Sequence, residues 1–525
     1  MKKNQSSLVA DTIKESQNMR FRLVLEGLFV GLLAGGLAIF YRVALEEVEA
    51  IMRNYLSVAA GNVLYIIGWF ILLVILAGLV SYCLKKEPMI SGSGIPQVEG
   101  EISGYFEQSW FKVIGYKLIS GILCILGGLS LGREGPSIQL GAMIGKGISK
   151  GFHRFKLEEK YLLTCGASAG LAAAFNAPLA GVMFALEEIH KNFSASVLIS
   201  VMCASIVGDF ISQNVFGLEP VFRFPVESAM PLANYWLLIL FGIFIGVLGV
   251  GYNYVLLKTQ KLYEKVPGLK PHQRVLLPFL LAGVLGFTMP EILGGGHYMI
   301  DLLYSDHLVL QVLLVLFLGK FIFSMLSFCS GAPGGIFFPL LVMGAYLGGA
   351  FGLVAVNALG LDTALINNFI ILAMAGYFTA IVRAPITGII LISEMTGSFQ
   401  HLLSLSVVCI VSYLTASVFR SVPIYESLLD RLLMKQNIRQ VGDTQNKILL
   451  EFVVALGSPL SHRKIAQVVW PEHCLLVAIR RGGREVIPKG SVEIMPGDIL
   501  VALVKEDCAA NIRIELLQKC SEGSV

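Results

Sequence analysis

Three motifs of glycine and proline interrupt long apolar stretches of this chain: GSGIPQ at 92–97, GREGPS at 132–137 and GAPGGIFFP at 331–339. A bilayer tolerates irregular backbone at membrane depth only where that backbone is buried in protein or lines a cavity. Two of the motifs place glycines and a proline where a helix would start, and the free N–H groups of a helix N-terminus favour an anion. The motifs therefore predict an anion pathway built from helix ends.

The composition indicates a membrane protein with many spans. The chain is 55% hydrophobic and 14% charged, with a mean hydropathy of +0.73, whereas soluble domains carry about 25% charged residues. Asn62–Val80 and Leu232–Tyr252 are long enough to cross a bilayer, but Val275–Met289 and Leu402–Val418 are short or interrupted. Such segments are typical of broken-helix transporters, so we predict an all-α polytopic membrane protein with broken helices.

Charge and cysteine usage exclude several other classes. A net charge of +4 gives no indication of nucleic-acid binding, and the nine cysteines are widely spaced without a CxxC pair. We find no Walker motif, catalytic triad or metal-spaced histidine cluster, so we expect no enzyme, cofactor or metal site. Basic residues precede the first span and predict a cytoplasmic N-terminus without a cleaved signal peptide: Lys2, Lys3, Lys14, Arg20 and Arg22.

The apolar body contains an internal repeat. Residues 165–188 align without gaps to residues 372–395, at an offset of 207. Among the matching positions, Ala177, Pro178, Gly181 and Glu187 are identical to Ala384, Pro385, Gly388 and Glu394. A repeat with helix breakers in corresponding positions points to a mid-membrane site between the halves. The alignment alone is compatible with a parallel or an inverted repeat.

The composition changes near residue 432, which predicts two domains. We expect a transport domain at 1–435, with repeats of about 20–215 and 232–420, a polar linker at 436–446 and a small α+β domain at 447–518. Within the small domain we expect strands at 449–456, 474–481 and 498–504. We also expect a short helix at 462–470 and a closing helix at 507–518. A domain of about 70 residues is more stable as a dimer.

Glu134 is the first candidate for ion chemistry, because it lies inside GREGPS with apolar sequence on both sides. It could be a carboxylate that competes with the anion or carries a proton, since an ionisable residue within the membrane is a functional hypothesis by default. It could equally be a surface glutamate paired with Arg133.

Glu187 and Glu188 end an apolar run, and His190 follows at once, so a helix end that reaches water is the simpler interpretation. One detail favours a function for Glu188. Glu187 is matched by a glutamate in the repeat, whereas Glu188 is matched by Met395. A structural role shared by both halves therefore does not explain Glu188.

Two hydroxyl side chains complete the candidates. Ser93 lies between glycines and before Pro96, where its hydroxyl could donate to an anion or cap the following helix. Tyr425 follows Pro423 and Ile424, a setting more common for an interfacial anchor than for a ligand.

The three motifs, in this order and with FNAPLAGVMFALEE (175–188) between them, resemble the signature segments of the CLC chloride channels and chloride/proton antiporters. The resemblance covers about residues 20–435. It implies an inverted-repeat CLC fold and a homodimer with a separate anion pore in each subunit.

The resemblance also implies roles for individual residues. The hydroxyls of Ser93 and Tyr425 would coordinate chloride together with the backbone N–H groups of Ile336 and Phe337. Glu134 would be the gating glutamate. Glu188 would be the internal proton-transfer glutamate of the antiporter branch.

The C-terminal domain is similar to the RCK (TrkA-C) regulatory modules in its IRRGG turn, at 479–483, and in Pro496-Gly497-Asp498. Such modules dimerise, and some bind cyclic di-AMP, so Arg480 and Arg481 could line a nucleotide site. A solvated basic turn is the simpler interpretation of these two arginines.

Together these features predict a chloride/proton antiporter of the bacterial plasma (inner) membrane, with both termini in the cytoplasm and a regulatory C-terminal domain. The first alternative is a passive chloride channel of the same fold. The second, from another class, is a membrane-anchored receptor that senses a nucleotide.

Overall fold

The structure is a computed structural model that describes residues 2–222, 224, 230–265, 268, 270–304, 309–436, 447–482, 484–505 and 508–521. The chain divides into two compact units, Met1–Leu432 and Leu433–Val525, and each is described by itself. The predicted linker at 436–446 lies outside the described residues apart from Gln436.

The first unit is helical throughout its described residues. Its α-helices in chain order are α1 (Lys2–Ala59), α2 (Val63–Lys86), α3 (Ile95–Ile102), α4 (Trp110–Leu126), α5 (Glu134–Gly151), α6 (Lys156–Phe175), α7 (Pro178–Phe184), α8 (Ala195–Phe216), α9 (Tyr235–Glu264), α10 (Leu276–Thr288), α11 (His297–Leu303), α12 (Leu310–Cys329), α13 (Phe337–Leu359), α14 (Leu365–Val382), α15 (Pro385–Thr396), α16 (Leu402–Val418) and α17 (Ile424–Lys435). Among the described residues, 7 helices are long and apolar enough to cross a membrane. The predicted all-α polytopic body with broken helices is confirmed.

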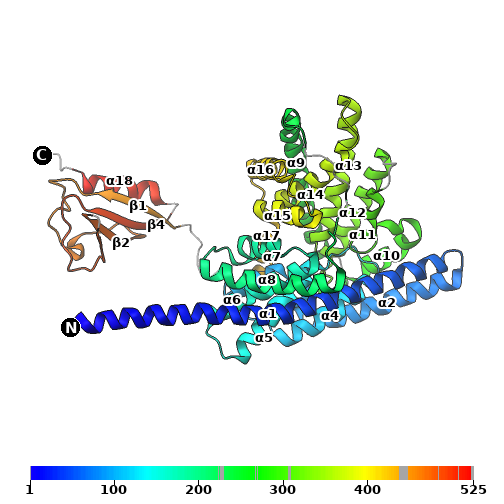
Figure 1. Ribbon diagram of the computed structural model, residues 1–525, viewed down its shortest axis with the longest axis horizontal. Helices are drawn as coiled ribbons and strands as arrows, with labels where there is room; N and C mark the ends of the chain where they lie inside the picture. The colour runs from blue at the N-terminus through cyan, green and yellow to red at the C-terminus, as the bar shows by residue number, and fades with distance from the viewer. Residues whose placement is uncertain are drawn as a thin grey trace. The chain divides into compact units, whose positions relative to one another are not determined.

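The internal repeat is visible in the order of the helices. In each half a long pair packs together, α5 with α6 and α13 with α14. A short helix that begins at a proline follows each pair, α7 at Pro178 and α15 at Pro385. Figure 1 shows α1, α2 and α4 of the first half running across the direction of α9 and α13 in the second half. The two halves thus repeat one plan in different orientations.

The breaks between α6 and α7 and between α14 and α15 have the same local cause. Asn176 and Arg383, which correspond in the repeat, both adopt the left-handed conformation, with φ of 52° and 73°. A residue in that conformation ends a helix, and the proline two residues later suits the first position of the next helix. The sequence therefore stops and restarts the helix at equivalent points of both halves.

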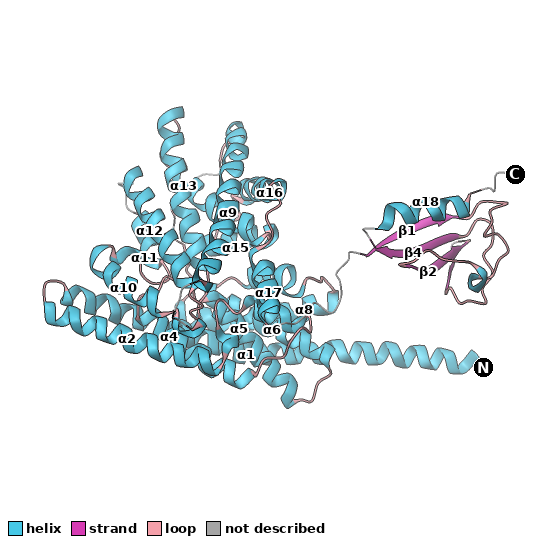
Figure 2. Ribbon diagram, turned by 180° about the vertical axis from the view of Figure 1, so that it is seen from behind, coloured by secondary structure: helices cyan, strands magenta, loops and turns pink. Residues whose placement is uncertain are grey.

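The second unit is a small antiparallel sheet with one helix against it (Figure 2). The strands β1 (Lys447–Val453), β2 (Cys474–Arg481), β3 (Arg484–Val486) and β4 (Ile499–Lys505) lie in the order β1-β4-β2-β3. The helix α18 (Ala509–Cys520) packs on β1 and β4. Buried Phe452, Ile479 and Leu516 form part of a separate hydrophobic core. The three predicted strands and the closing helix are present.

The predicted helix at 462–470 is wrong. Only a single 3-10 turn forms there, at Ile465–Gln467. The backbone instead forms hydrogen bonds with a later segment. Ile465 N donates to Val492 O at 3.0 Å, and Ala466 N donates to Gly490 O at 3.0 Å. These partners are distant in sequence, which local helix propensity does not register. The short strand β3 was also not predicted.

Candidate ion site

The three glycine-proline motifs meet in space. Gly132 N donates to Gly335 O at 2.7 Å, and Gly335 N donates to Gly132 O at 2.8 Å. Gly334 N donates to Gly92 O at 3.0 Å. Segments separated by about 40 and 200 residues along the chain are therefore tied into one backbone cluster.

Each motif opens a helix at this cluster. α3 begins at Ile95, α5 at Glu134 and α13 at Phe337. The first N–H groups of a helix have no acceptor within that helix, and the helix dipole is positive at this end. The predicted helix ends are confirmed, and they present N–H donors around one place in the protein.

Close packing explains a glycine in the GREGPS motif. A Cβ atom added to Gly135 would lie 2.8 Å from both the carbonyl oxygen and the Cβ atom of Ser93. Only glycine lets the start of α5 come this close to the Ser93 segment. The Ser93 side chain is 2% exposed, and its hydroxyl accepts from Ile95 N at 3.3 Å. The hydroxyl proton stays available for another acceptor, so capping and anion donation are compatible.

Glu134 is fully buried, and neither carboxylate oxygen has a hydrogen-bond partner within the described part of the chain. A Cβ atom added to Gly132 would lie 2.5 Å from Glu134 Oε2 and 3.2 Å from Phe338 N, so the carboxylate lies near the first turn of α13. Arg133 bonds mainly to Glu46, at 2.6 Å, while its Nε lies 3.9 Å from Glu134. The alternative of a surface pair with Arg133 does not fit this burial.

Tyr425 lies at the start of α17, fully buried, and its hydroxyl has no partner among the described residues. Its ring meets Phe184 edge-on at 6.3 Å, and Phe184 meets Phe337 at 5.6 Å. An interfacial anchor would lie at the protein surface, so the geometry favours a ligand.

Glu187 and Glu188 differ sharply. Glu187 accepts from Thr387 N at 2.8 Å and from Thr387 Oγ1 at 2.7 Å, at the start of α15. Glu188 is 5% exposed, and its Oε1 has no partner within the described residues. Both lie in a π-helical turn, Ala185–His190, which continues α7, and such turns are frequent at functional sites. Glu188 is therefore not a helix end that reaches water.

Two lysines near the site were missed by the sequence analysis. Lys117 Nζ donates to Ile90 O at 2.8 Å and to Gly92 O at 2.7 Å. Lys320 Nζ donates to Ile292 O at 3.0 Å and to Gly294 O at 2.7 Å. Both lysines are fully buried, and each holds a loop through two backbone carbonyls. The signal was a lysine in the middle of an apolar helix, Lys117 in α4 and Lys320 in α12.

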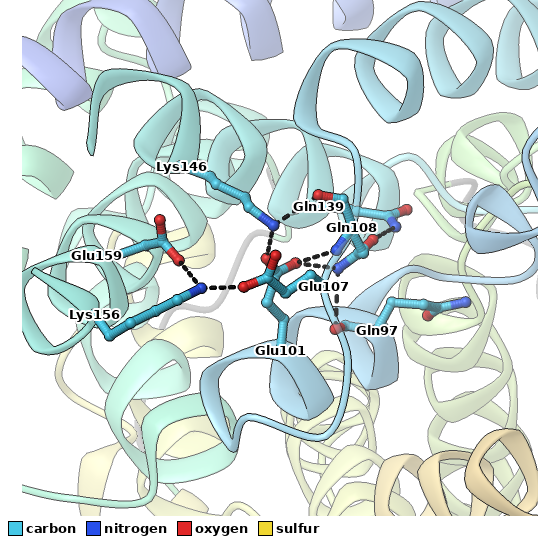
Figure 3. Close-up of polar contacts among 8 residues, drawn as sticks. All are labelled: Gln97, Glu101, Glu107, Gln108, Gln139, Lys146, Lys156 and Glu159. Carbon is cyan, nitrogen blue, oxygen red and sulfur yellow. Dashed lines mark hydrogen bonds and ion pairs between the residues drawn. The ribbon is translucent and has the colours of Figure 1, made fainter. Parts of the chain in front are cut away.

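A buried polar network joins α3 to α5 (Figure 3). Gln139 Nε2 donates to Gln108 Oε1 at 2.8 Å, and Gln108 Nε2 donates to Glu101 Oε2 at 2.9 Å. Lys146, fully buried, forms an ion pair with Glu101 and donates to Gln108 O at 2.6 Å. The network fixes the helix that follows Ser93 against the helix that carries Glu134.

Comparison with known proteins identifies the body of the chain. A family model described as "Voltage gated chloride channel" matches residues 75–417. The H(+)/Cl(-) exchange transporter ClcA of Salmonella gallinarum is 34% identical over 427 residues, which is 79% of this chain and 90% of that protein. The chain belongs to the CLC family. The ClcA protein of Citrobacter koseri is 33% identical over 436 residues, covering 81% of this CLC protein and 92% of its relative.

Solved structures agree with this assignment. A slow cyanobacterial Cl-/H+ antiporter superposes on the CLC protein with a TM-score of 0.75 at 30% identity, covering 79% of this chain and 99% of that chain. A CLC-type fluoride/proton antiporter shares the fold, with a TM-score of 0.66 at 23% identity over 77% of this chain and 97% of that chain. The predicted inverted-repeat CLC fold is confirmed.

The C-terminal part of this CLC protein matches the TrkA-C domain model over residues 449–513. Arg481 forms a two-pronged ion pair with buried Asp498, with Nε and Nη2 each 2.8 Å from a carboxylate oxygen. Arg480 pairs with Glu451 at 3.0 Å, and both side chains are about half exposed. Arg481 thus has a structural partner, whereas Arg480 keeps most of its access to solvent.

Proposed function

We propose that this CLC protein is a chloride/proton antiporter of the bacterial inner membrane. One observation carries the proposal: two carboxylates, Glu134 and Glu188, are buried in the transport domain, and each has an oxygen without a hydrogen-bond partner among the described residues. A passive anion pore needs no second buried carboxylate, because burial of an unpaired charge is costly. The relatives named above as exchange transporters support the same proposal.

Glu134 serves as gate and as proton carrier in this proposal. Its carboxylate lies near the N-terminus of α13, where an anion is stabilised by N–H groups and the dipole. An ionised Glu134 therefore competes with chloride for this place, and protonation removes the competing charge. Each exchange of carboxylate for chloride then moves a proton.

Chloride binds next to Glu134, held by donors that have no other acceptor. The Tyr425 hydroxyl is buried and unpartnered among the described residues, and the Ser93 proton is free to donate. The N–H groups of Ile336 and Phe337 at the start of α13 complete the set. A desolvated anion gains most from such preorganised donors.

Glu188 passes protons between Glu134 and the water on the opposite side of the membrane from the one that Glu134 faces. Its turn packs against α3, which carries Glu99, and the Glu99 side chain forms an ion pair with Lys191 at 2.6 Å. The Lys191 side chain is 46% exposed, so this pair reaches water. We infer that protons enter at this pair, because it links buried Glu188 to solvent.

Flux measurements in liposomes separate this proposal from the two alternatives. An antiporter uses a chloride gradient to drive protons uphill. A channel passes chloride current without protons, and a receptor passes neither ion. Glu188→Gln is the informative variant, with Glu187→Gln as the matched control on the same turn.

We further propose that the C-terminal domain is cytoplasmic, as is the N-terminus, and that it regulates transport as a dimer. Leu449 and Leu475 both flank Leu503 in the sheet, and the first two are exposed on the face away from the core. A second copy of the domain would cover this apolar face. Cyclic di-AMP is the proposed ligand, with exposed Arg480 as the better-placed phosphate partner.

Titration calorimetry with cyclic di-AMP tests the ligand. Binding that weakens on Arg480→Gln supports it, and absence of heat at high micromolar concentration from a folded dimer removes it. Truncation after residue 446 should leave chloride transport and abolish regulation, because the three motifs and Tyr425 lie upstream.

A further inference from the structure

An open cavity of about 330 Å³ lies beside the GREGPS motif. Its walls come from α1, from Gly132 and Arg133, and from the start of α11. Glu46, in the cavity wall, has a side chain that is 46% exposed, so the cavity communicates with water. Its volume exceeds that needed for several water molecules, at about 30 Å³ each.

His297 lies in the wall of this cavity and contacts the first turn of α13. It is the first residue of α11, and it lines the cavity. Its ring stacks on Phe338, with centroids 4.0 Å apart and an interplanar angle of 15°. Its Nε2 atom is buried and has no hydrogen-bond partner among the described residues.

The Glu134 carboxylate lies near the backbone amide of the same phenylalanine. Its Oε2 and the Phe338 amide nitrogen both lie within about 3 Å of the place where a Gly132 side chain would stand. Gly132 itself lines the cavity, whereas Glu134 is fully buried. Gly132 therefore lies beside both the cavity and the Glu134 carboxylate.

The other charged groups in the cavity wall are already engaged. Arg133 pairs with Glu46 at 2.6 Å, and Arg53 pairs with Glu49 at 2.9 Å. A guanidinium does not release its proton in a protein. His297 therefore carries, in the cavity wall, a buried and unengaged nitrogen that can both accept and release a proton.

The internal repeat shows that this histidine is not required by the fold. α3 begins at Ile95 and α11 at His297, each directly after a glycine with positive φ, Gly94 and Gly296. A buried lysine holds the loop before each helix, since Lys117 donates to Gly92 O and Lys320 donates to Gly294 O. Ile95 is fully buried and apolar. An apolar side chain is therefore enough at this position of the fold, and the ring nitrogens of His297 are not needed to start the helix.

We propose that His297 relays protons between water in this cavity and the Glu134 carboxylate. The imidazolium gives a proton to the carboxylate, directly or through one water molecule, which leaves a neutral imidazole and a carboxylic acid. The imidazole then takes a proton from cavity water, and the reverse steps return it. The inference rests on the proposed antiport, because only a transporter that moves protons needs the relay.

Several charged groups lie around the His297 imidazole, and their charges affect how readily it takes up or gives up a proton. They come from α1, from the GREGPS motif, from α11 itself and from α12, and they are Arg42, Glu46, Glu49, Arg53, Arg133, Asp301 and Lys320.

His297→Phe is the decisive variant, since it keeps an aromatic ring to stack on Phe338 and removes both nitrogens. In liposomes with a chloride gradient, we expect both proton and chloride flux to fall by at least about 10-fold, the scale of a lost proton-transfer group. The ratio of chloride to protons should stay unchanged, because Glu134 still carries the proton. His401→Phe is the matched control: His401 is buried with an unpartnered Nε2 but lies at the start of α16.

A second background separates a proton relay from a packing role. In Glu134→Ala the transporter no longer moves protons, so a proton relay has nothing to do. Adding His297→Phe to this variant should therefore change chloride flux by less than about two-fold, which is the usual limit for the effect of one mutation on another when the two are independent. A similar slowing in both backgrounds would overturn the relay and make His297 a part of the anion path. Wild-type exchange rates in His297→Phe would also overturn it. A wild type that moves no protons would instead refute the antiport. His297→Gln repeats the test if the phenylalanine variant does not fold.

Discussion

Glu187 and Glu394, which correspond in the internal repeat, each cap a helix of the opposite half. Glu187 accepts from the backbone N–H groups of Ile386 and Thr387 at the start of α15. Glu394 accepts from those of Leu179 and Ala180 at the start of α7. The reciprocal pairing is the signature of a two-fold relation between the halves. It also accounts for Glu187 without any role in transport.

The reciprocal caps predict matched stability effects. Glu187→Ala and Glu394→Ala should each destabilise the transport domain by about 1–2 kcal/mol, because each leaves two N–H groups of a helix start without their acceptor. Thermal unfolding of the detergent-solubilised protein measures this loss. Substitution by glutamine keeps an acceptor and should cost less. A large effect at one residue with none at the other would contradict the symmetry.

The second prediction contrasts the adjacent glutamates. Glu188→Gln should keep chloride transport while proton movement falls at least about 10-fold, because a buried proton carrier is removed. Glu187→Gln should do much less, since Glu187 caps α15. Parallel records of chloride efflux and proton uptake give both numbers. Equal loss of coupling in the two variants would show that the turn as a whole, and not Glu188, carries protons.

The third prediction concerns selectivity. Ser93→Pro removes one hydroxyl donor from a desolvated anion. Chloride concentrates its charge more than nitrate, so chloride should lose more of its stabilisation. The nitrate-to-chloride permeability ratio should rise, as measured by flux with each anion. An unchanged ratio would mean that the Ser93 hydroxyl only caps the start of α3, by accepting from Ile95 N, and does not bind the anion.

The fourth prediction concerns acid stability of the C-terminal domain. Burial alone would raise the pKa of Asp498, but hydrogen bonds from Arg481 and from Met495 N outweigh it and lower that pKa. Because the folded-state pKa is below the unfolded value of about 3.9, the pair stabilises the domain above that pH. The contribution is lost as the pH falls through the folded-state pKa.

Asp498→Asn should accordingly cost about 2 kcal/mol at neutral pH and flatten the acid limb of the stability curve. Urea unfolding of residues 447–521, which have their own core, measures both. Arg480→Gln is the control, since its pair with Glu451 is exposed and is worth less than about 1 kcal/mol. Equal costs for the two variants would contradict the structural role of the Arg481–Asp498 pair.

Much of the fold follows from the sequence because the chain breaks its own helices with glycine and proline. Two of the three motifs were predicted to start helices, and all three lie at helix starts, those of α3, α5 and α13. The aligned prolines of the repeat, Pro178 and Pro385, lie at the starts of α7 and α15. The hydrogen bonds that bring the motifs together, such as Gly132 with Gly335, join residues about 200 positions apart. Neither hydropathy nor local propensity contains that information.

The site was predicted unevenly for the same reason. Glu134 and Ser93 stand inside motifs, so the sequence marks them. Lys117 and His297 stand outside the motifs, and their importance depends on which loop or cavity the fold places beside them. The helix predicted at 462–470 failed likewise, since pairing with residues 490–494 decides that segment.

The central claim is that the buried Glu134 carboxylate couples proton movement to chloride movement. The most direct measurement compares wild type with Glu134→Ala in liposomes under a chloride gradient, with chloride and proton flux recorded together. The account predicts uphill proton movement in wild type, and chloride flux without proton movement in the variant. Proton pumping that survives in Glu134→Ala would contradict it.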